Sequence, residues 1–228
     1  MPELTPVVAV LVAAGRGDRL GGDRPKAFAA LAGRPLLAES LERLDRSTLL
    51  DAVVVVAPSG WEEPAILLAE ELGAGKVASC VSGGATRAES VRIGVAEAPA
   101  EAAVIVVHDA ARPLVEDEVI GRLLGALAEG FDGAVPGLPV SDTVKRAPGG
   151  VVAETVDRAD LYTVQTPQAF LAPVFRGALA ASPEDATDCA GIVERVGARV
   201  AVVPGDAALL KVTTPDDLAE VERLLAER

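Results

Sequence analysis

Basic side chains gather in a glycine-rich loop near the N-terminus, between Ala13 and Lys26. Small residues such as Ala13, Ala14 and Gly15 allow the backbone to approach a ligand, so that its N–H groups can meet an anion. The loop follows an apolar run, and ligands of α/β proteins bind at the carboxyl ends of parallel strands. The pattern favours an anion site over a solvated loop whose cations pair with nearby acids. The basic residues are Arg16, Arg19, Arg24 and Lys26.

Two widespread phosphate-binding motifs do not match this loop. The dinucleotide motif GxGxxG needs a third glycine, but Leu20 stands at that position after Gly15 and Gly17. The second apolar run ends Val56-Ala57-Pro58, without an acid to hold a ribose. The P-loop pattern GxxxxGK followed by Ser or Thr is also absent. An NAD-dependent oxidoreductase and a P-loop protein are therefore excluded.

A carboxylate ends the fourth apolar run, in the segment Val107-His108-Asp109-Ala110-Ala111-Arg112-Pro113. An acid followed by small residues at a strand end is well placed to coordinate Mg²⁺ on a nucleotide, so Asp109 is the candidate metal ligand. His108 is the only histidine of the chain. We interpret it as a structural hydrogen-bonding group, which is the commoner role of a lone histidine at a strand end.

Two further segments place polar groups beside an expected helix start. The segment from Ser82 to Ser90 reads SGGATRAES, a glycine turn that could present backbone groups to a base or ribose. An ordinary loop between strand and helix would explain this segment equally well. Lys211 lies just before Thr214, the expected N-cap of the last helix.

The charge balance limits the partners of the chain. The formal net charge is −13 and aromatic residues make up 3%. Nucleic-acid binders usually show a basic stripe or an aromatic stacking platform, so no nucleic-acid partner is expected. An anionic substrate must be held by a local cluster of Lys and Arg. A zinc site or a structural disulfide is not expected from one histidine and the distant cysteines Cys80 and Cys189.

No apolar run approaches the roughly 18 residues that cross a bilayer. The first residues carry Glu3 and no basic group, unlike a secretory signal. We expect a cytoplasmic protein without a membrane partner, and no second catalytic domain after Arg228.

The chain alternates between expected strands and helices over most of its length. β-branched runs without period-2 alternation are typical of parallel strands covered on both faces. They predict strands at residues 7–12, 52–57, 76–81 and 103–107. Helices are predicted at 36–44, 64–72, 116–128, 215–226 and 87–96, the last opened by a Thr86–Glu89 capping box. This order indicates an α/β fold with a mostly parallel sheet.

Residues 133–169 interrupt the alternation. Two short strand-like runs, 142–147 and 151–156, flank Pro148-Gly149-Gly150 and predict an inserted β-hairpin. A hairpin alone is marginally stable in water, so we expect this one to pack on something else, such as a second subunit.

With these segments in this order, the chain resembles the family of 2-C-methyl-D-erythritol 4-phosphate cytidylyltransferases of the non-mevalonate isoprenoid pathway. The resemblance covers nearly the whole chain. The motif HDAARP together with the N-terminal loop AAGxGxR…PK is specific for this family and its close relatives, whereas the loop alone indicates only the wider nucleotidyltransferase group. The other matching motifs are GGxxRAxS, DTVKR, QTPQ, Thr187-Asp188 and the terminal KVT with PDD.

The resemblance implies a Rossmann-like α/β/α sandwich with a mostly parallel twisted sheet and a protruding β-hairpin arm. It also implies a single nucleotidyltransferase domain over residues 1–228, with the arm inserted at about 138–160 and helping to form a homodimer. The hairpin expected from the residues matches that arm in position.

The resemblance further implies the substrates CTP and 2-C-methyl-D-erythritol 4-phosphate, and their contacts. Asp109 would hold Mg²⁺, or a similar divalent cation, on the triphosphate. CTP would lie against Ala13, Ala14, Gly15, Gly84 and Ser90. The catalytic cations around its α-phosphate would be Arg19, Lys26 and Lys211. The acceptor would meet Asp109, Arg112, Thr166, Thr187 and Lys211 from one subunit, and Thr143 and Arg158 from the arm of a neighbouring copy.

One position departs from the family pattern. Cys189 follows Thr187-Asp188, where the family usually carries an acid. The contacts that the resemblance implies for Thr187 therefore rest on a weaker match than those of the N-terminal loop.

The residues favour an in-line displacement without a covalent intermediate. A phosphate monoester is already an anionic nucleophile at neutral pH, so its oxygen can attack the α-phosphorus of CTP without a general base. Catalysis would then rest on positioning and electrostatics. Two alternatives stay open: a cytidylyltransferase for ribitol 5-phosphate or another polyol phosphate, and a non-catalytic nucleotide-binding protein on the same fold.

Overall fold

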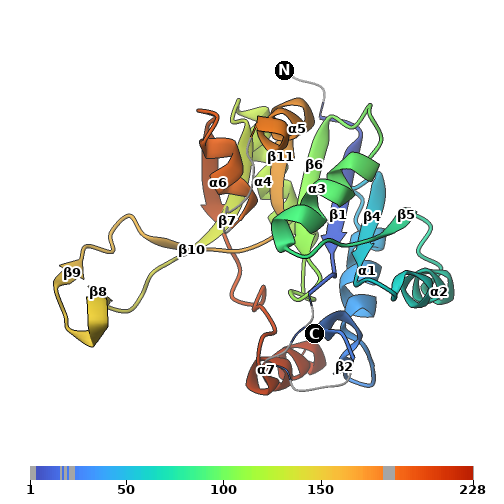
Figure 1. The fold of residues 1–228 in the computed structure, drawn as a ribbon, viewed down its shortest axis with the longest axis horizontal. Helices are drawn as coiled ribbons and strands as arrows, with labels where there is room; N and C mark the ends of the chain where they lie inside the picture. The colour runs from blue at the N-terminus through green and yellow to red at the C-terminus, as the bar shows by residue number, and fades with distance from the viewer. Residues whose placement is uncertain (1–3, 16, 18–19, 21–23, 182–187, 228) are drawn as a thin grey trace.

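The computed structural model of the chain describes residues 4–15, 17, 20, 24–181 and 188–227. Its main feature is an eight-stranded sheet with helices on both faces (Figure 1). The strands of the sheet are β1 (Val7–Val12), β4 (Ala52–Ala57), β5 (Val77–Ser82), β6 (Val104–Asp109), β7 (Gly133–Pro139), β10 (Tyr162–Val164), β11 (Gln168–Leu171) and β12 (Val200–Pro204). The helices are α1 (Leu36–Arg46), α2 (Glu62–Leu72), α3 (Arg87–Glu97), α4 (Asp117–Ala128), α5 (Ala172–Ala181), α6 (Cys189–Glu194) and α7 (Pro215–Ala226).

The strands pair in the order β10-β7-β11-β6-β1-β4-β5, with β12 also paired to β7. Strands β1, β4, β5 and β6 are parallel, while β11 and β10 run antiparallel to β7. At the end of the central strand β1, Val12 pairs with Val56 of β4 and Asp109 of β6. The carboxyl ends of three strands therefore meet at one edge of the sheet, where α/β proteins bind ligands.

Alternate residues of the strands pack on opposite faces of the sheet. Along β1, Ala9 and Leu11 belong to the core formed with α1, α2 and α4. Val8 and Val10 belong to the core formed with α3, α5 and α6. Because both faces are covered, the strands carry continuous apolar runs. The predicted α/β/α sandwich with a mostly parallel sheet is confirmed.

The predicted strands and helices are present, with ends shifted by a few residues. Strand β6 runs on to Asp109, and α2 begins at Glu62 rather than at residue 64. The Thr86 side chain accepts a hydrogen bond from the Glu89 N–H at 3.1 Å, as predicted. The Glu89 carboxylate, however, accepts from the Ala85 N–H at 2.7 Å instead of from Thr86. The capping box expected at α3 is therefore only half formed.

The interrupted segment 133–169 contributes strands to the main sheet as well as the hairpin. Strands β7, β10 and β11 come from this segment. The sequence did not predict these strands. For β7 the reason is that Pro136, Gly137 and Pro139 break its apolar pattern, and proline is unusual inside a sheet. The hairpin is nevertheless inserted where the sequence predicts it, between β7 and β10.

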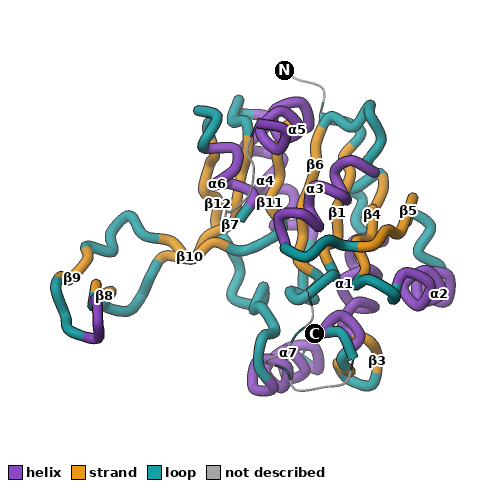
Figure 2. Tube along the Cα trace, in the orientation of Figure 1, coloured by secondary structure: helices purple, strands orange, loops and turns teal. Residues whose placement is uncertain are grey.

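The inserted hairpin forms the end of an arm that extends away from the sheet (Figures 1 and 2). Its strands β8 (Val144–Arg146) and β9 (Glu154–Val156) are antiparallel and joined through the 3-10 turn η2 (Pro148–Gly150). The predicted hairpin is confirmed, with shorter strands. Val151 and Val152 at its end are 73% and 59% exposed, so the arm carries apolar surface that this chain does not bury.

A small layer lies beyond the carboxyl ends of the strands. It contains η1 (Lys26–Phe28), the short pair β2 (Ala30–Leu31) and β3 (Arg34–Pro35), and α7. Leu31, Val212 and Val221 share a small core there, and the Ala32 N–H donates to Glu222 of α7 at 2.8 Å. This layer fixes the two segments that carry Lys26 and Lys211.

No helix in the described part of the chain combines the length and apolar character that crossing a membrane requires. The cytoplasmic location expected from the sequence stays a prediction.

Gly94 allows α3 to pack closely on the sheet. A Cβ atom at Gly94 would lie 2.4 Å from Val10 Cγ1 and 2.6 Å from Val56 Cγ2, and both valines are fully buried. Gly94→Ala should therefore destabilise the protein by about 1–3 kcal/mol, as overpacked cores do, measured by chemical unfolding.

Gly125→Ala is the matched control, because Gly125 is exposed on α4 and a Cβ there would meet no atom within 4 Å. We expect it to be neutral or to stabilise the protein by up to about 1 kcal/mol, since alanine favours the helix. Equal losses from the two substitutions would contradict the packing argument.

Candidate active site

A cleft of about 1080 Å³ lies at the carboxyl ends of β1, β4, β5 and β6. This volume is slightly above the usual range for small-molecule sites, about 300–1,000 Å³. Asp109 is the one carboxylate among the described residues that line it. The basic lining residues are Arg24, Lys26, Arg87 and Lys211. Positive charge is thus concentrated here in a chain of net charge −13, which suits an anionic ligand.

Glycines bring two loops of the cleft together. A Cβ atom at Gly83 would lie 2.3 Å from the Ala14 Cβ, so only glycine lets the turn after β5 approach the loop after β1 this closely. The neighbouring Gly84 N–H donates to Ser90 Oγ at 3.1 Å, and that hydroxyl donates to the Thr86 carbonyl at 2.9 Å. Three of the predicted CTP contacts, Ala14, Gly84 and Ser90, therefore share one wall, and Ala13 and Gly15 also line the cleft.

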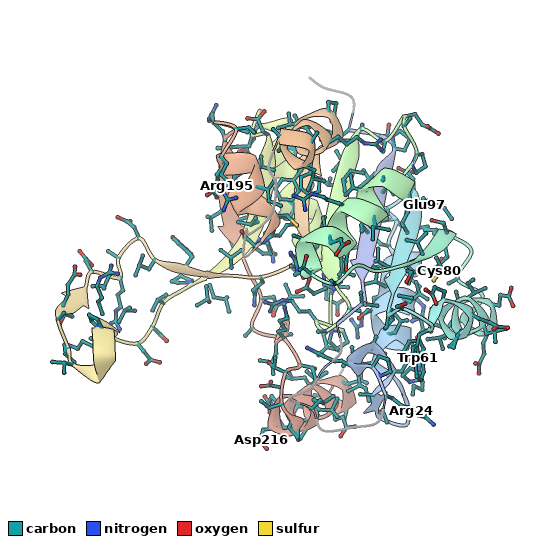
Figure 3. All side chains as sticks on the ribbon, in the orientation of Figure 1. Arg24, Trp61, Cys80, Glu97, Arg195 and Asp216 are labelled. Atoms are coloured by element: carbon teal, nitrogen blue, oxygen red, sulfur yellow. The ribbon has the colours of Figure 1, made fainter. Side chains whose placement is uncertain are left out.

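Another part of the cleft lining comes from η1 and the loop after β4. Gly17 has a φ of +78°, and a Cβ there would lie 2.4 Å from the Lys26 Cβ, so both its conformation and its contact require glycine. Trp61 packs on Phe28 with ring centroids 4.6 Å apart. Trp61 and Arg24, both labelled in Figure 3, line this side of the cleft.

Asp109 is held by two cations from distant parts of the chain. Its Oδ1 accepts from Arg87 Nε at 2.9 Å and lies 2.8 Å from Arg87 Nη2, and its Oδ2 accepts from Lys211 Nζ at 2.7 Å. Burial favours the neutral acid, but Arg87 and Lys211 outweigh it and hold the pKa of Asp109 well below its usual range. The carboxylate is therefore ionised, with both oxygens engaged.

His108 belongs to a buried network behind Asp109. The His108 ring lies with Nε2 3.0 Å from the Arg112 carbonyl and Nδ1 3.2 Å from Thr166 Oγ1. The Asp109 N–H donates to the same Thr166 oxygen at 3.0 Å. A neutral ring that donates from Nε2 and accepts the Thr166 hydroxyl at Nδ1 satisfies every group, and burial lowers the pKa of His108 to about 4. This geometry agrees with the interpretation of His108 as structural.

The described residues among the predicted acceptor contacts form two groups, one around Asp109 and one on the arm. Thr166 and Lys211 contact Asp109, and Arg112 follows it in a turn closed by its own N–H to the Asp109 carbonyl at 2.9 Å. The Arg112 guanidinium donates from Nη1 to the Leu209 carbonyl at 2.5 Å, while its buried Nε has no hydrogen-bond partner among the described residues. Arg112 and Thr166 are not among the residues that line the cleft.

Thr143 and Arg158 lie on the arm, where both are exposed. Arg158 Nη1 donates to the Ser141 carbonyl within the arm. Neither residue lines the cleft of its own chain. Arg19 and Thr187, also predicted for the site, lie outside the described residues.

Sequence reasoning missed Arg87 and Trp61 as residues of the cleft. Arg87 was assigned only to the start of a helix, although it stands in the motif GGxxRAxS that indicated the site. That motif was the signal available for Arg87. Trp61 follows the second strand in a segment without any recognisable motif, and nothing in the sequence marked it.

The donor set suits a magnesium ion held largely by its substrate. Among the described residues, no three His, Cys, Asp or Glu side chains form a group able to hold a metal. Mg²⁺ is commonly bound by one or two carboxylates together with substrate phosphates and water. Asp109 provides one ionised carboxylate in a cleft whose other charged residues, among those described, are all cations, so it fits a metal that arrives with a triphosphate.

The known proteins that are similar to this chain share one description. Residues 7–227 match the family model described as IspD, 2-C-methyl-D-erythritol 4-phosphate cytidylyltransferase. The chain is 47% identical to the protein of that name from Nocardia farcinica, over 97% of this chain and 95% of the relative. It is 46% identical to the one from Saccharopolyspora erythraea, over 96% of this chain and 99% of the relative.

Solved structures with the same fold carry related names. The crystal structure of 2-C-methyl-D-erythritol 4-phosphate cytidylyltransferase from Thermus thermophilus aligns with a TM-score of 0.77 at 34% identity, covering 96% of this chain and 98% of that one. A crystal structure of 4-diphosphocytidyl-2C-methyl-D-erythritol synthase aligns with a TM-score of 0.80 at 35% identity and the same coverage.

The buried neutral state of His108 makes stability depend on pH. The pKa of His108 is about 4 in the folded protein and about 6.5 in an unfolded chain. Below pH 6.5 the unfolded state therefore binds a proton that the folded state does not. The free energy of unfolding of metal-free protein should fall by about 2 kcal/mol between pH 7 and pH 5, measured by urea unfolding.

His108→Gln is the matched control, because the chain has no other histidine and most carboxylates stay ionised in this window. The variant should lose stability at pH 7 but show a much flatter pH dependence. An equally steep fall in the variant would show that His108 is not the group responsible.

Proposed function

The chain belongs to the 2-C-methyl-D-erythritol 4-phosphate cytidylyltransferase family, and from this premise we propose that it transfers a cytidylyl group from CTP to 2-C-methyl-D-erythritol 4-phosphate and releases pyrophosphate. The observation that carries the proposal is the cationic cleft. Lys26, Arg87 and Lys211 line it, and Asp109, the one carboxylate among its described lining residues, is paired with Arg87 and Lys211. Such a cleft suits the meeting of two phosphorylated substrates.

The reaction is an in-line displacement at phosphorus. An oxygen of the acceptor's phosphate forms a bond to the α-phosphorus of CTP, and the bond from that phosphorus to the oxygen of pyrophosphate breaks. The attacking oxygen is already anionic at neutral pH, so no side chain has to remove a proton. This agrees with the fully buried position of His108, whose two ring nitrogens are engaged within the protein.

We assign Lys26 and Lys211 to stabilise the charge that develops on the α-phosphoryl oxygens. Both residues line the cleft. Lys26 lies in η1, near the start of the chain, and Lys211 lies shortly before α7, near its end. Fixed cations that meet developing charge lower the barrier because they need no reorganisation during the reaction. We assign the same role to Arg19. Ala13, Ala14, Gly15, Gly84 and Ser90 form the nucleotide-binding surface.

We assign Mg²⁺, or a similar divalent cation, to Asp109. When bound, it would neutralise negative charge on the triphosphate. Asp109 contributes an ionised carboxylate without any change of protonation, because its pKa is held low by Arg87 and Lys211 against the effect of burial.

We assign the acceptor to the region around Asp109, Arg112, Thr166, Thr187 and Lys211. The contacts of Thr166 and Lys211 with Asp109 support this assignment among the described residues. Thr143 and Arg158 would come from the arm of a second copy. Support comes from their exposed positions and from the apolar end of the arm at Val151 and Val152, which a homodimer would cover.

The activity is tested by pyrophosphate release with CTP, ATP, GTP and UTP, each combined with methylerythritol phosphate or ribitol 5-phosphate, with and without Mg²⁺. We expect release only with CTP, methylerythritol phosphate and Mg²⁺ together. Preference for ribitol 5-phosphate would transfer the assignment to a polyol phosphate cytidylyltransferase. No release with any pair, from folded protein, would favour a nucleotide-binding role.

The arm is tested by mixing two variants that are each impaired in a different part of the site. Lys26→Ala removes a cation from the cleft and should lower kcat about 100-fold to 1000-fold, by analogy with a lost oxyanion donor. Arg158→Ala should weaken the use of the acceptor while CTP binding stays unchanged. Mixed subunits should regain activity, because a heterodimer has one site with intact Lys26 and an intact neighbouring arm.

Exchange of subunits must be verified by native mass spectrometry of differently tagged chains. Arg146→Ala is the matched control for Arg158→Ala, because Arg146 also lies on the arm but pairs with Glu154 in the hairpin. Absence of recovery after verified exchange would mean that each site is built within one chain.

A further inference from the structure

Arg87 makes more contacts with the Asp109 carboxylate than any other described residue does. Two of its nitrogens, Nε and Nη2, lie 2.9 and 2.8 Å from Oδ1. Arg87 is the first residue of α3, directly after the N-cap Thr86. The capped helix start therefore fixes the backbone from which the guanidinium reaches Asp109.

The two oxygens of Asp109 are held differently. Oδ1 meets the planar guanidinium of Arg87, whose side chain is 28% exposed. Oδ2 meets the single ammonium of Lys211, whose side chain is 40% exposed. A lysine on a flexible stem exchanges partners more readily than an arginine that donates twice in a fixed plane. Oδ2 is thus the oxygen that can be released to another cation.

Cys189 supports Arg87 from the side away from Asp109. Arg87 Nη1 lies 3.6 Å from Cys189 Sγ, and the Cys189 backbone N–H donates to Gln168 Oε1 at 3.2 Å. Burial raises the pKa of the Cys189 thiol to about 11, so the thiol is neutral. Among the ion pairs of the described residues, Asp109 is the only carboxylate that Arg87 contacts. The charge of Arg87 is therefore directed at Asp109.

We propose that Arg87 is a positioning residue that fixes Oδ1 of Asp109 and leaves Oδ2 to bind a divalent cation in exchange for the Lys211 ammonium. The inference rests on the proposed function and extends it to a residue outside the assigned contacts. Lys211 then has two successive partners. It pairs with Asp109 before the metal–nucleotide complex binds, and with substrate phosphate afterwards.

The first test measures metal binding without turnover. Mn²⁺ serves as the probe, and its binding to the protein with CTP, but without acceptor, is followed by electron paramagnetic resonance. Arg87→Gln should weaken Mn²⁺ binding about 10-fold to 100-fold, the usual effect of losing a group that orients a metal ligand. Arg87→Lys should weaken it less, because it keeps the charge but loses the planar fork.

Binding of CTP without metal is the second readout. Trp61 is the only tryptophan of the chain and lines the cleft, so its fluorescence can report nucleotide binding. Because Arg87 also adds to the positive charge of the cleft, metal-free CTP affinity should fall in Arg87→Gln, but by much less than Mn²⁺ affinity, and least in Arg87→Lys, which keeps the charge. A large loss there would overturn the proposal, since it would mean that Arg87 binds the nucleotide itself. Arg92→Gln is the matched control: Arg92 lies on the same helix and outside the cleft lining.

A double substitution tests whether Arg87 acts through Asp109. In an Asp109→Asn background, Arg87→Gln should add little to the loss of Mn²⁺ affinity, because the group it positions is already altered. Additive losses would overturn the proposal, as would unchanged Mn²⁺ affinity in a folded Arg87→Lys protein. Circular dichroism confirms folding, and the Arg87→Lys series decides the question if Arg87→Gln does not fold.

These outcomes are separable from those of the proposed function. A silent pyrophosphate assay combined with the expected Mn²⁺ shifts would overturn the transfer reaction but retain the role of Arg87. Normal transfer combined with unchanged Mn²⁺ affinity in the Arg87 variants would retain the transfer reaction but overturn the role of Arg87.

Discussion

The site depends on one buried carboxylate that must stay ionised. Asp109 is almost completely buried at the end of β6, and an ionised acid in that position is costly unless it is paired. Arg87 from the start of α3 and Lys211 from the segment before α7 supply the pairing. One electrostatic requirement thus ties together three parts of the chain that lie far apart in sequence. Removing either cation would leave the carboxylate only partly compensated.

The fold meets this requirement through its sheet register and its glycines. Val12 of β1 pairs with Asp109, so the glycine-rich loop after β1 starts beside the carboxylate. The loop after β5 reaches the same place only because Gly83 tolerates contact with Ala14, and Gly94 lets α3 lie close to the sheet. Arg87 is carried by that helix. Gly83 and Gly94 therefore allow α3 to pack closely on the sheet, and this packing also places Arg87 beside Asp109.

Sequence patterns predicted the parts of this arrangement that depend on local chemistry. Continuous apolar runs indicated β1, β4, β5 and β6, and glycines with basic residues indicated the loop that carries Lys26. Strand β7 was missed because Pro136 and Pro139 obscure it. The contact of Arg87 with Asp109 was missed for another reason: it spans 22 residues and exists only once α3 packs on the sheet. No local pattern encodes such a pair, although both residues stood in motifs that indicated the site.

The remaining constraint concerns the second substrate. The cleft of one chain brings together the small residues of the loop after β1 and the cations. Thr143 and Arg158 belong instead to the arm, which extends away from the sheet (Figure 2). Antiparallel pairing of β7 with β10 directs the arm outward, and the two-stranded pair at its end is too small to be stable by itself. Val151 and Val152 are exposed, and they stabilise the arm only if another protein surface buries them. If a second copy covers them, the same contact that stabilises the arm also delivers Thr143 and Arg158 to a site. Acceptor binding and assembly would then share one source of free energy.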